Sequence, residues 1–224
     1  MKLNFERVAI ILLVTFSMYG YIAGCTHDDE ILASSGPDIT RGTQKCSLTN
    51  PKVSFDKAHS NVQWATLYLG ATSLLTGRFD NFGFNKFEFD ESNAAGISFE
   101  AWVWLNTVNT SEPARDDGCL LTTFGTNGTN TTQPENMAII KSKSVELSTT
   151  DKGYIVKADL IFHGVTKEIS CKMRYDGKTL SGTQDVLGFG LEFPFLAKTD
   201  FLIASTNIGD NVDVKCNATF RINP

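Results

Sequence analysis

The sequence has 224 residues, of which 42% are hydrophobic and 20% are charged, with a formal net charge of −5. This length suits one large all-β domain or two small domains, and the composition is ordinary for a globular protein. An acidic chain with no cluster of Lys or Arg after residue 45 excludes the basic surface that nucleic-acid binding requires. Phenylalanine is over-represented, with 16 copies, so much aromatic surface is either buried in a core or available to an apolar ligand.

The first 24 residues are typical of an export signal. Lys2 and Arg7 precede an apolar stretch that is short for a membrane span and is arranged like a secretory signal peptide. The stretch ends in Ile-Ala-Gly-Cys at residues 22–25, which resembles a bacterial lipobox. The resemblance implies cleavage before Cys25, diacylglycerol on its thiol and a further acyl chain such as palmitate on its amine. An ordinary signal peptide with a chance cysteine is the alternative.

The residues after Cys25 indicate a tether. Thr26 rather than Asp at the next position favours the outer membrane, by resemblance to bacterial lipoprotein sorting. The acidic run at residues 28–30 resembles a surface-export signal or is a solvated linker. We therefore expect an outer-membrane lipoprotein of the cell envelope, on the periplasmic side or at the cell surface. Residues 25–50 are polar and rich in turn formers, which predicts a tether and lead-in before a folded domain at 51–224.

Four cysteines remain if Cys25 is lipidated: Cys46, Cys119, Cys171 and Cys216. An even number in an oxidising compartment permits two disulfides with three pairings. The spacings match no zinc pattern, so no metal site is expected. We favour a Cys46–Cys119 bridge, because both residues lie in loop-like sequence, and interpret the two strand cysteines as buried thiols.

Apolar residues alternate with polar ones from residue 53 onward, which is the pattern of half-buried strands. The alternating segments are separated by clusters of Asn, Asp and Gly, and they lie at 61–68, 96–106, 153–164, 186–197 and 211–222. Many short strands with regular turns favour a barrel or a sandwich, and closure would remove exposed sheet edges. At most one short helix is expected, at 115–124, followed by a polar loop at 125–136.

One face of these strands carries large apolar side chains. Periodicity leaves open whether they fill the barrel as a core or line a pocket for an apolar ligand. The orientation of Trp102 and Trp104 also stays open, because a bulge would shift strand parity by one residue. The candidate lumen residues on the apolar face are Val62, Trp64, Tyr68, Phe79, Phe99, Val103, Leu160, Phe162, Phe193 and Phe195.

Residues that could form a catalytic site are sparse. His27 falls in the tether, His59 precedes a strand and His163 follows one. The sequence contains no nucleophile elbow, no zinc-binding His-Glu-x-x-His helix and no phosphate-binding glycine loop. No catalytic residues are therefore assigned. We interpret His163 and Gly164 as a hairpin corner, in which glycine permits a tight turn and the histidine braces it.

Six motifs, in order, resemble the YceI-like family: FDKAHSNVQW (55–64), LLTGRF (74–79), ARDD (114–117), IKSKSVE (140–146), DLIFHGVTKEI (159–169) and NIGDNVDV (207–214). The most specific is the Leu-x-x-His-Gly-Val-Thr-Lys stretch. The family usually has a histidine shortly after its Arg-Asp motif, whereas this chain continues Asp117-Gly118-Cys119. The four mature cysteines and the lipobox are also not general family features.

The resemblance implies an all-β, lipocalin-like, extended antiparallel barrel of about eight strands. It also implies a noncatalytic protein whose lumen holds a polyisoprenoid, such as the tail of a quinone or a prenyl carrier lipid, with Val62, Trp64, Phe79, Phe99, Leu160 and Phe162 facing that lumen. We expect a carrier or store with no cofactor beyond such a bound lipid, anchored to a membrane. The alternative is a structural or adhesive lipoprotein with a filled barrel. The oligomeric state stays open, a dimer included.

Overall fold

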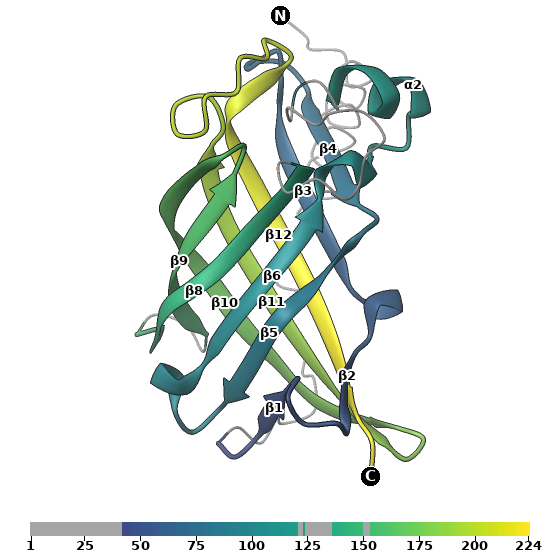
Figure 1. Cartoon of the computed structure of the whole chain (residues 1–224), viewed down its shortest axis with the longest axis vertical. Coiled ribbons are helices and arrows are strands. Elements are labelled where there is room, and N and C mark those ends of the chain that lie inside the picture. The colour runs from purple at the N-terminus through teal and green to yellow at the C-terminus, as the bar shows by residue number, and fades with distance from the viewer. Residues whose placement is uncertain (1–41, 121–122, 124–135, 150–152) are drawn as a thin grey trace, which may run out of the picture. The chain divides into compact units, whose positions relative to one another are not determined.

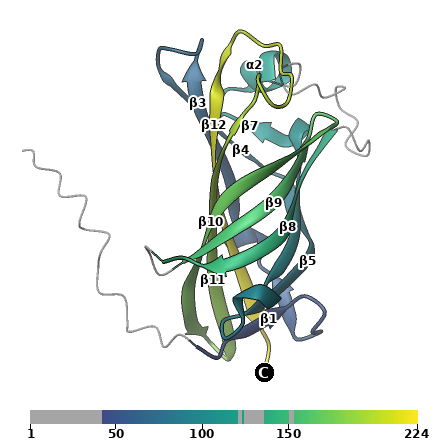
Figure 2. The ribbon, with the colours of Figure 1, turned by 90° about the vertical axis from the view of Figure 1, so that its left-hand side faces the viewer.

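The computed structural model describes residues 42–120, 123, 136–149 and 153–224. It confirms the expected fold class, because nearly all regular structure in the described part belongs to one antiparallel sheet that curls into a barrel (Figures 1 and 2). The strands are β1 (Lys45–Ser47), β2 (Val53–Phe55), β3 (Asn61–Tyr68), β4 (Leu74–Phe79), β5 (Phe82–Asp90), β6 (Ser98–Trp104), β7 (Val108–Asn109), β8 (Met137–Leu147), β9 (Tyr154–Phe162), β10 (Val165–Ser181), β11 (Gln184–Leu196) and β12 (Ile208–Ile222).

Helical structure is confined to short turns in the described residues. A three-residue helix, α2 (Pro113–Arg115), continues into a π-helical turn, η5 (Asp116–Leu120), where a helix over 115–124 was expected. Residues 121–122 and the polar loop expected at 125–136, apart from Asn136, lie outside the description. Three 3₁₀ turns complete the set: η2 (Lys57–His59), η3 (Ala94–Gly96) and η4 (Leu105–Thr107).

The folded part begins earlier than the expected boundary at residue 51. Lys45–Ser47 forms β1, which pairs with the end of β5 in the register Cys46 to Phe89. Cys46 is 1% exposed and belongs to the core. The sequence around β1 is polar, and only one of the three side chains of this strand is buried. Such a segment has no alternating pattern from which a strand could be predicted.

Strand order in the sheet is β1-β5-β6-β8-β9-β10-β11-β12-β3-β4-β7, with β2 added beside β12. The long strands are adjacent hairpin partners, so most of the pairing is local, as in a meander. In the described part, no strand pairing joins β5, near one margin of the sheet, to β3 or β4, near the other margin. We call the gap between these two margins the seam. The side chains and turns that span this seam therefore decide whether the barrel is closed.

The seam is bridged by an aromatic contact and by turn hydrogen bonds. Phe55 of β2 packs edge-on against Phe84 of β5, with ring centroids 5.0 Å apart, and also contacts Phe220 of β12 at 5.6 Å. Next to it, the Lys57 ammonium donates a hydrogen bond to Asn81 across the seam, at 3.0 Å. Apolar burial thus closes the barrel where strand pairing does not.

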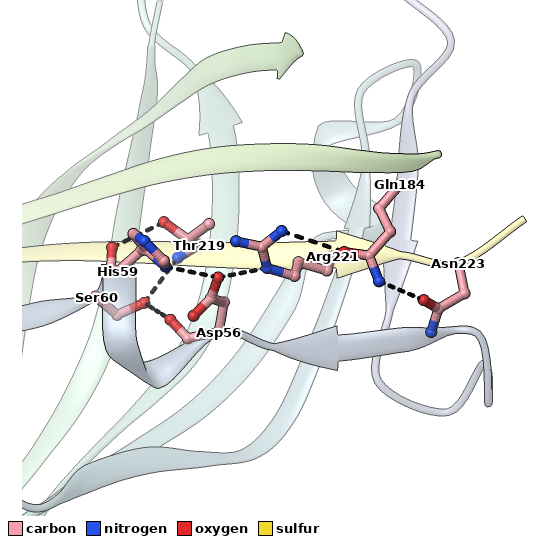
Figure 3. A network of polar contacts seen from close by, with 7 residues as sticks. All are labelled: Asp56, His59, Ser60, Gln184, Thr219, Arg221 and Asn223. Atoms are coloured by element: carbon pink, nitrogen blue, oxygen red, sulfur yellow. Dashed lines mark hydrogen bonds and ion pairs between the residues drawn. The ribbon is translucent and has the colours of Figure 1, made fainter. Parts of the chain in front are cut away.

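A polar network holds the segment that carries Phe55 against β12 (Figure 3). One oxygen of Asp56 accepts hydrogen bonds from Arg221 Nε at 2.5 Å and from His59 Nδ1 at 2.9 Å. The Ser60 hydroxyl donates to the Asp56 carbonyl at 2.7 Å and accepts from the Thr219 amide at 2.9 Å. The side chain of Asp56 is only 10% exposed, so this pair is screened less than the surface ion pairs.

These donors set the charge state of Asp56. Burial by itself would raise the pKa of this carboxyl, but the hydrogen bonds from Arg221 and His59 outweigh it and hold the pKa below its usual range. The folded state therefore keeps Asp56 ionised at pH values where the unfolded chain is already protonated. Its contribution to stability is complete above the ordinary Asp pKa and is lost as pH falls through the lower, folded value.

We expect Asp56→Asn to lower the free energy of unfolding by about 1–3 kcal/mol at pH 7, because Arg221 then loses its ionised partner. The difference between the two proteins should begin to shrink below about pH 4, where the unfolded carboxyl takes up protons, and should disappear as pH falls through the lower pKa of the native carboxyl. Urea unfolding followed by tryptophan fluorescence at pH 7 and pH 3 measures it. Asp80→Asn, which removes an exposed partner of Arg78, is the matched control and should change stability by less than about 0.5 kcal/mol. A difference of equal size at both pH values would contradict the assignment.

Candidate functional site

The barrel contains an apolar cavity above a packed floor. It has a volume of about 130 Å³ and is lined by residues of every long strand. The lining includes only two polar side chains, Asn61 and Asn217, which hydrogen-bond to each other at 3.4 Å. The apolar and glycine residues that line it are Phe55, Val62, Trp64, Phe79, Phe82, Gly83, Phe84, Phe87, Phe99, Ala101, Trp102, Val103, Leu105, Ala138, Ile139, Ile140, Leu160, Phe162, Met173, Phe189, Gly190, Leu191, Phe193, Phe195, Val212, Val214, Cys216 and Ala218.

The structure brings nine of the ten candidate lumen residues together around this cavity, and Tyr68 is the correction. Tyr68 is 43% exposed at the last position of β3, beyond the cavity. It shares strand parity with Trp64, but the β3–β4 hairpin projects past the end of the barrel. Alternation identifies the face of a strand, not the point at which the strand leaves the core. The nine that line the cavity are Val62, Trp64, Phe79, Phe99, Val103, Leu160, Phe162, Phe193 and Phe195.

Several lining residues come from β5, which the sequence reading did not treat as a lumen strand. The register of β5 against β6 shifts between Phe84 and Lys86, so Phe82, Phe84, Phe87 and Phe89 do not follow one strict alternation. Such a bulge turns later residues to the other face. The signal that could have found them is the density of phenylalanine in residues 82–89.

The indole ring of Trp64 can lie across the neighbouring strand β4 because its cross-strand partner, Gly77, has no side chain. A Cβ on Gly77 would lie 2.5 Å from Cζ2 of the indole, which no packed structure accommodates. Glycine at this position therefore lets the ring lie flat over the neighbouring strand. Trp102 lies over Gly83 in the same manner, and its ring is 6.2 Å from that of Trp104. Trp102 and Trp104 alternate with Val103 along β6, and Trp102 is nevertheless among the residues that line the cavity, as is Gly83.

Packed aromatic rings form the floor of the cavity and fill the lumen beneath it. Phe220 is fully buried and stacks on Phe87 at 4.2 Å between centroids. Phe189 contacts both Phe87 at 4.9 Å and Phe89 at 4.8 Å. The aromatic series therefore serves two purposes: Phe89 and Phe220 belong to the core alone, whereas Phe87 and Phe189 belong to the core and also line the cavity. Both alternatives left open by periodicity are realised in different parts of one lumen.

The loop between β11 and β12, residues 197–207, covers the other end of the cavity. Its Phe201 is fully buried and packs on Phe162 and Phe195, at centroid distances of 5.3 and 5.4 Å. The Asp210 carboxylate accepts hydrogen bonds from the backbone amides of Lys198 at 2.7 Å and Thr199 at 3.0 Å. Ile203 is buried beside Phe201. We call this segment the covering loop.

His163 and Gly164 form the two-residue turn between β9 and β10. Both have positive φ, at 52° and 73°, as hairpin turns of this length require. Histidine is among the residues that tolerate this backbone. The His163 Nδ1 donates a hydrogen bond to the Phe201 carbonyl at 3.1 Å, so the hairpin corner also supports the covering loop.

The cysteines are free thiols where the structure describes them, at Cys46, Cys171 and Cys216. The expected Cys46–Cys119 bridge is therefore corrected. Cys46 lies on β1 at one end of the barrel, whereas residue 119 lies in η5, next to α2 at the other end (Figure 1). The side chain of Cys119 is outside the description. The bridge was predicted because both cysteines lie in loop-like sequence. Local composition does not indicate at which end of a barrel a residue lies.

Cys216 is the one cysteine that lines the cavity. Burial raises its pKa to about 12, with smaller contributions from Cys171 and Glu192, and burial likewise raises that of Cys171 to about 12. Both thiols are therefore neutral at physiological pH, and a neutral buried thiol acts as a small apolar group rather than a nucleophile. Cys216 extends the apolar lining, and Cys171 belongs to the core.

Within residues 42–120, 123, 136–149 and 153–224, no group of three or more His, Cys, Asp or Glu side chains is arranged to hold a metal ion. In the same residues, no helix is long and apolar enough to cross a membrane.

Solved structures with the same fold have low sequence identity to this chain. The chain is similar to BcnA of Burkholderia cenocepacia, with 16% identity and a TM-score of 0.58, over 74% of this chain and 99% of that one. It is similar to a YceI protein of Campylobacter jejuni, with 18% identity and a TM-score of 0.53, over 68% of this chain and 87% of that one. A domain of Saccharophagus degradans, described as polyisoprenoid-binding and implicated in plant cell wall breakdown, has 19% identity and a TM-score of 0.51, over 77% of this chain and 99% of that one.

The curated proteins include no match to this sequence. The model of the YceI-like domain family matches residues 54–220, from within β2 to two residues before the end of β12. This range includes the seam, all the cavity-lining strands and the covering loop. Because the match covers well over half of the chain and the fold agrees, the protein belongs to the YceI-like family.

Proposed function

We propose that the protein is a noncatalytic binding protein that holds a polyisoprenoid, or a similarly long apolar chain, in the lumen of its barrel. The observation that carries this proposal is the lining of the cavity, in which Asn61 and Asn217 are the two polar side chains and bond to each other. A polar ligand would lose its hydrogen bonds to water there and regain few, because these two amides are the polar side chains in the lining. An apolar chain loses nothing comparable.

The expected driving force is burial of hydrocarbon. Each CH₂ group removed from water contributes about 0.8 kcal/mol, so a few prenyl units suffice for useful affinity without any ionic contact. Aromatic walls suit the flat, branched units of an isoprenoid, because rings and methyl groups pack closely. The Saccharophagus degradans domain, which shares the fold and is described as polyisoprenoid-binding, supports an isoprenoid as the ligand class.

The arrangement of the histidines supports the noncatalytic part of the proposal. His59 bonds to Asp56 on the outside of the barrel, and His163 bonds to the backbone of the covering loop. Neither lines the cavity. Each ring is used to hold the fold together, so neither of the two histidines in the described part of the chain faces the space in which a ligand would lie.

We further propose that the protein is anchored through lipid on Cys25 in the outer membrane of the cell envelope. The support is the Ile-Ala-Gly-Cys stretch at 22–25, with Thr26 after it. Several acyl chains on one cysteine give stable anchoring, which a single chain does not. An anchored barrel stays beside a reservoir of apolar lipid, which suits a carrier or a store.

Organic extraction of the purified protein tests the ligand directly. We expect mass spectrometry of the extract to reveal a prenyl lipid in a fixed ratio to protein, because its tail gains burial in the cavity. The same protein, stripped by extraction and refolded, should take up an added polyprenol. Repeated absence of both would sink the proposal and favour a structural or adhesive role with a filled barrel.

A cavity-filling variant locates the site. Ala101 lines the cavity, so Ala101→Phe should reduce polyprenol uptake by about tenfold or more, because the new ring occupies space that the prenyl tail needs. Circular dichroism checks that the variant folds. Lys172→Phe adds the same ring at an exposed position of β10 and should bind like the native protein. Equal uptake by both variants would place the ligand elsewhere.

The anchor has its own test. We expect the expressed protein to incorporate labelled palmitate and to sediment with membranes, because acylated Cys25 partitions into lipid. Cys25→Ser should lose the label and leave the membrane fraction. A Cys46→Ser variant, which alters a buried thiol, is the control for changing a cysteine. Label retained by Cys25→Ser would overturn the lipobox assignment.

A further inference from the structure

Exposed apolar side chains gather at one end of the barrel, where the covering loop lies. Six of the eight large hydrophobic residues that are strongly exposed among the described residues belong to the β3–β4 hairpin or to the segment from the end of β11 through the covering loop. They are Leu67, Tyr68, Leu69, Leu74, Leu196 and Leu202. The other two, Leu147 and Leu180, lie at hairpins toward the opposite end (Figure 1). We call the group of six the leucine rim.

The two halves of the leucine rim form one surface. The Leu69 amide donates a hydrogen bond to the Asn207 carbonyl at 3.0 Å, which joins the β3–β4 hairpin to the covering loop. Leu69 and Leu202 both have positive φ, at 53° and 59°. Leucine is disfavoured in that conformation, where Gly or Asn is easier to accommodate. Two leucines at such positions, both pointing to solvent, gain nothing from the fold of this chain.

The charges beside the leucine rim are paired within the protein. Asp200 lies 3.5 Å from Lys167, and Asp210 accepts the backbone amides of Lys198 and Thr199. The nearby α2 and η5 add Glu112, Asp116 and Asp117 against Arg115, so this end of the barrel is acidic rather than basic. The leucine rim itself carries no charged side chain, which favours contact with an uncharged apolar phase over recognition by charge.

We propose that the leucine rim rests on a lipid bilayer, so that the covering loop forms the wall between the membrane and the cavity. Phe201 closes the cavity from inside while its neighbour Leu202 is 70% exposed. Insertion of Leu202 into the bilayer would draw the covering loop outward and separate Phe201 from Phe162. A prenyl chain would then pass from bilayer to lumen without crossing water; this second step rests on the proposed function.

The length of the chain before the sheet permits this orientation. The sheet begins at Lys45 on β1, at the end of the barrel opposite the leucine rim (Figure 1). About 20 residues separate Lys45 from Cys25, and they span up to about 65–70 Å when extended. The longest dimension of β12 is about 50 Å for its 15 residues. An anchor at Cys25 can therefore sit in the same bilayer as the leucine rim.

Tryptophan placed at either end of the barrel tests the contact in the full chain. Leu202→Trp and Leu180→Trp replace leucines of equal exposure, 70% and 71%, at opposite ends. Each protein is reconstituted into phosphatidylcholine vesicles whose acyl chains are brominated, and emission is compared with that of the unsubstituted chain. We expect loss of the added emission for Leu202→Trp and none for Leu180→Trp, because bromine quenches only a ring within the bilayer.

Quenching at both ends or at neither would overturn the docking proposal. So would sedimentation in detergent that shows a dimer which Leu202→Ser breaks, because the leucine rim would then be covered by a second copy of this chain. Neither result depends on whether the cavity holds an isoprenoid.

A transfer measurement tests the second step. The double variant Leu69→Ser, Leu202→Ser should take up a labelled polyprenol from vesicles about tenfold more slowly, because two apolar contacts with the bilayer are lost. Binding at equilibrium in detergent should not change. Leu147→Ser with Leu180→Ser is the matched control at the other end. Equal rates in both double variants would overturn the proposed route, whereas absence of binding in all proteins would refute the proposed function and leave the quenching result standing.

Discussion

Packing of phenylalanine rings across the seam is the interaction on which the barrel depends. The sheet has two unpaired margins, and an unpaired margin exposes backbone groups to water and to other chains. Phe220 of β12 stacks on Phe87 of β5, although β5 and β12 are far apart in the sheet order. Phe55 of β2 adds a further ring, which contacts Phe84 of β5 and Phe220 of β12. Since these contacts need no ligand, the lower half of the lumen stays closed when the cavity above it is empty.

The closed floor has a consequence for the cavity. A ligand cannot pass through stacked rings that are fully buried, such as Phe220, without disrupting the core that holds the two margins together. The opposite end is covered by a loop rather than by strands. That loop is held by a few buried side chains, Phe201 among them, and by polar contacts, chiefly those of Asp210 and His163. A loop of this kind opens at much lower cost in free energy than a core does, so exchange is expected at the covered end.

Residue alternation predicted the strands and most of the lumen because an inward-facing position must be apolar along the whole length of a barrel strand. It failed at Tyr68, where the strand continues past the core, and in β5, where a bulge shifts parity. It also missed β1, whose single buried side chain is too weak a pattern. Contacts between distant segments were not predictable from local patterns. Asp56 and Arg221, for example, are 165 residues apart, and the sequence around either residue does not indicate that it contacts the other. The motif that includes His163 identified a turn but not the loop that the turn supports.

The backbone at Leu202 connects the inside of the barrel to its outside. The left-handed conformation costs a leucine roughly 1–2 kcal/mol, and it lets two successive large side chains face opposite ways, with Phe201 buried on the cavity-lining rings and Leu202 in solvent. In water the exposed leucine contributes nothing that offsets this cost. Against lipid, burial of its side chain would contribute about 1.5–3 kcal/mol. Leu202 would thus strain the covering loop in water and stabilise the outward position of this loop at a membrane. A cover that opens toward its lipid source and stays shut elsewhere must behave in this way.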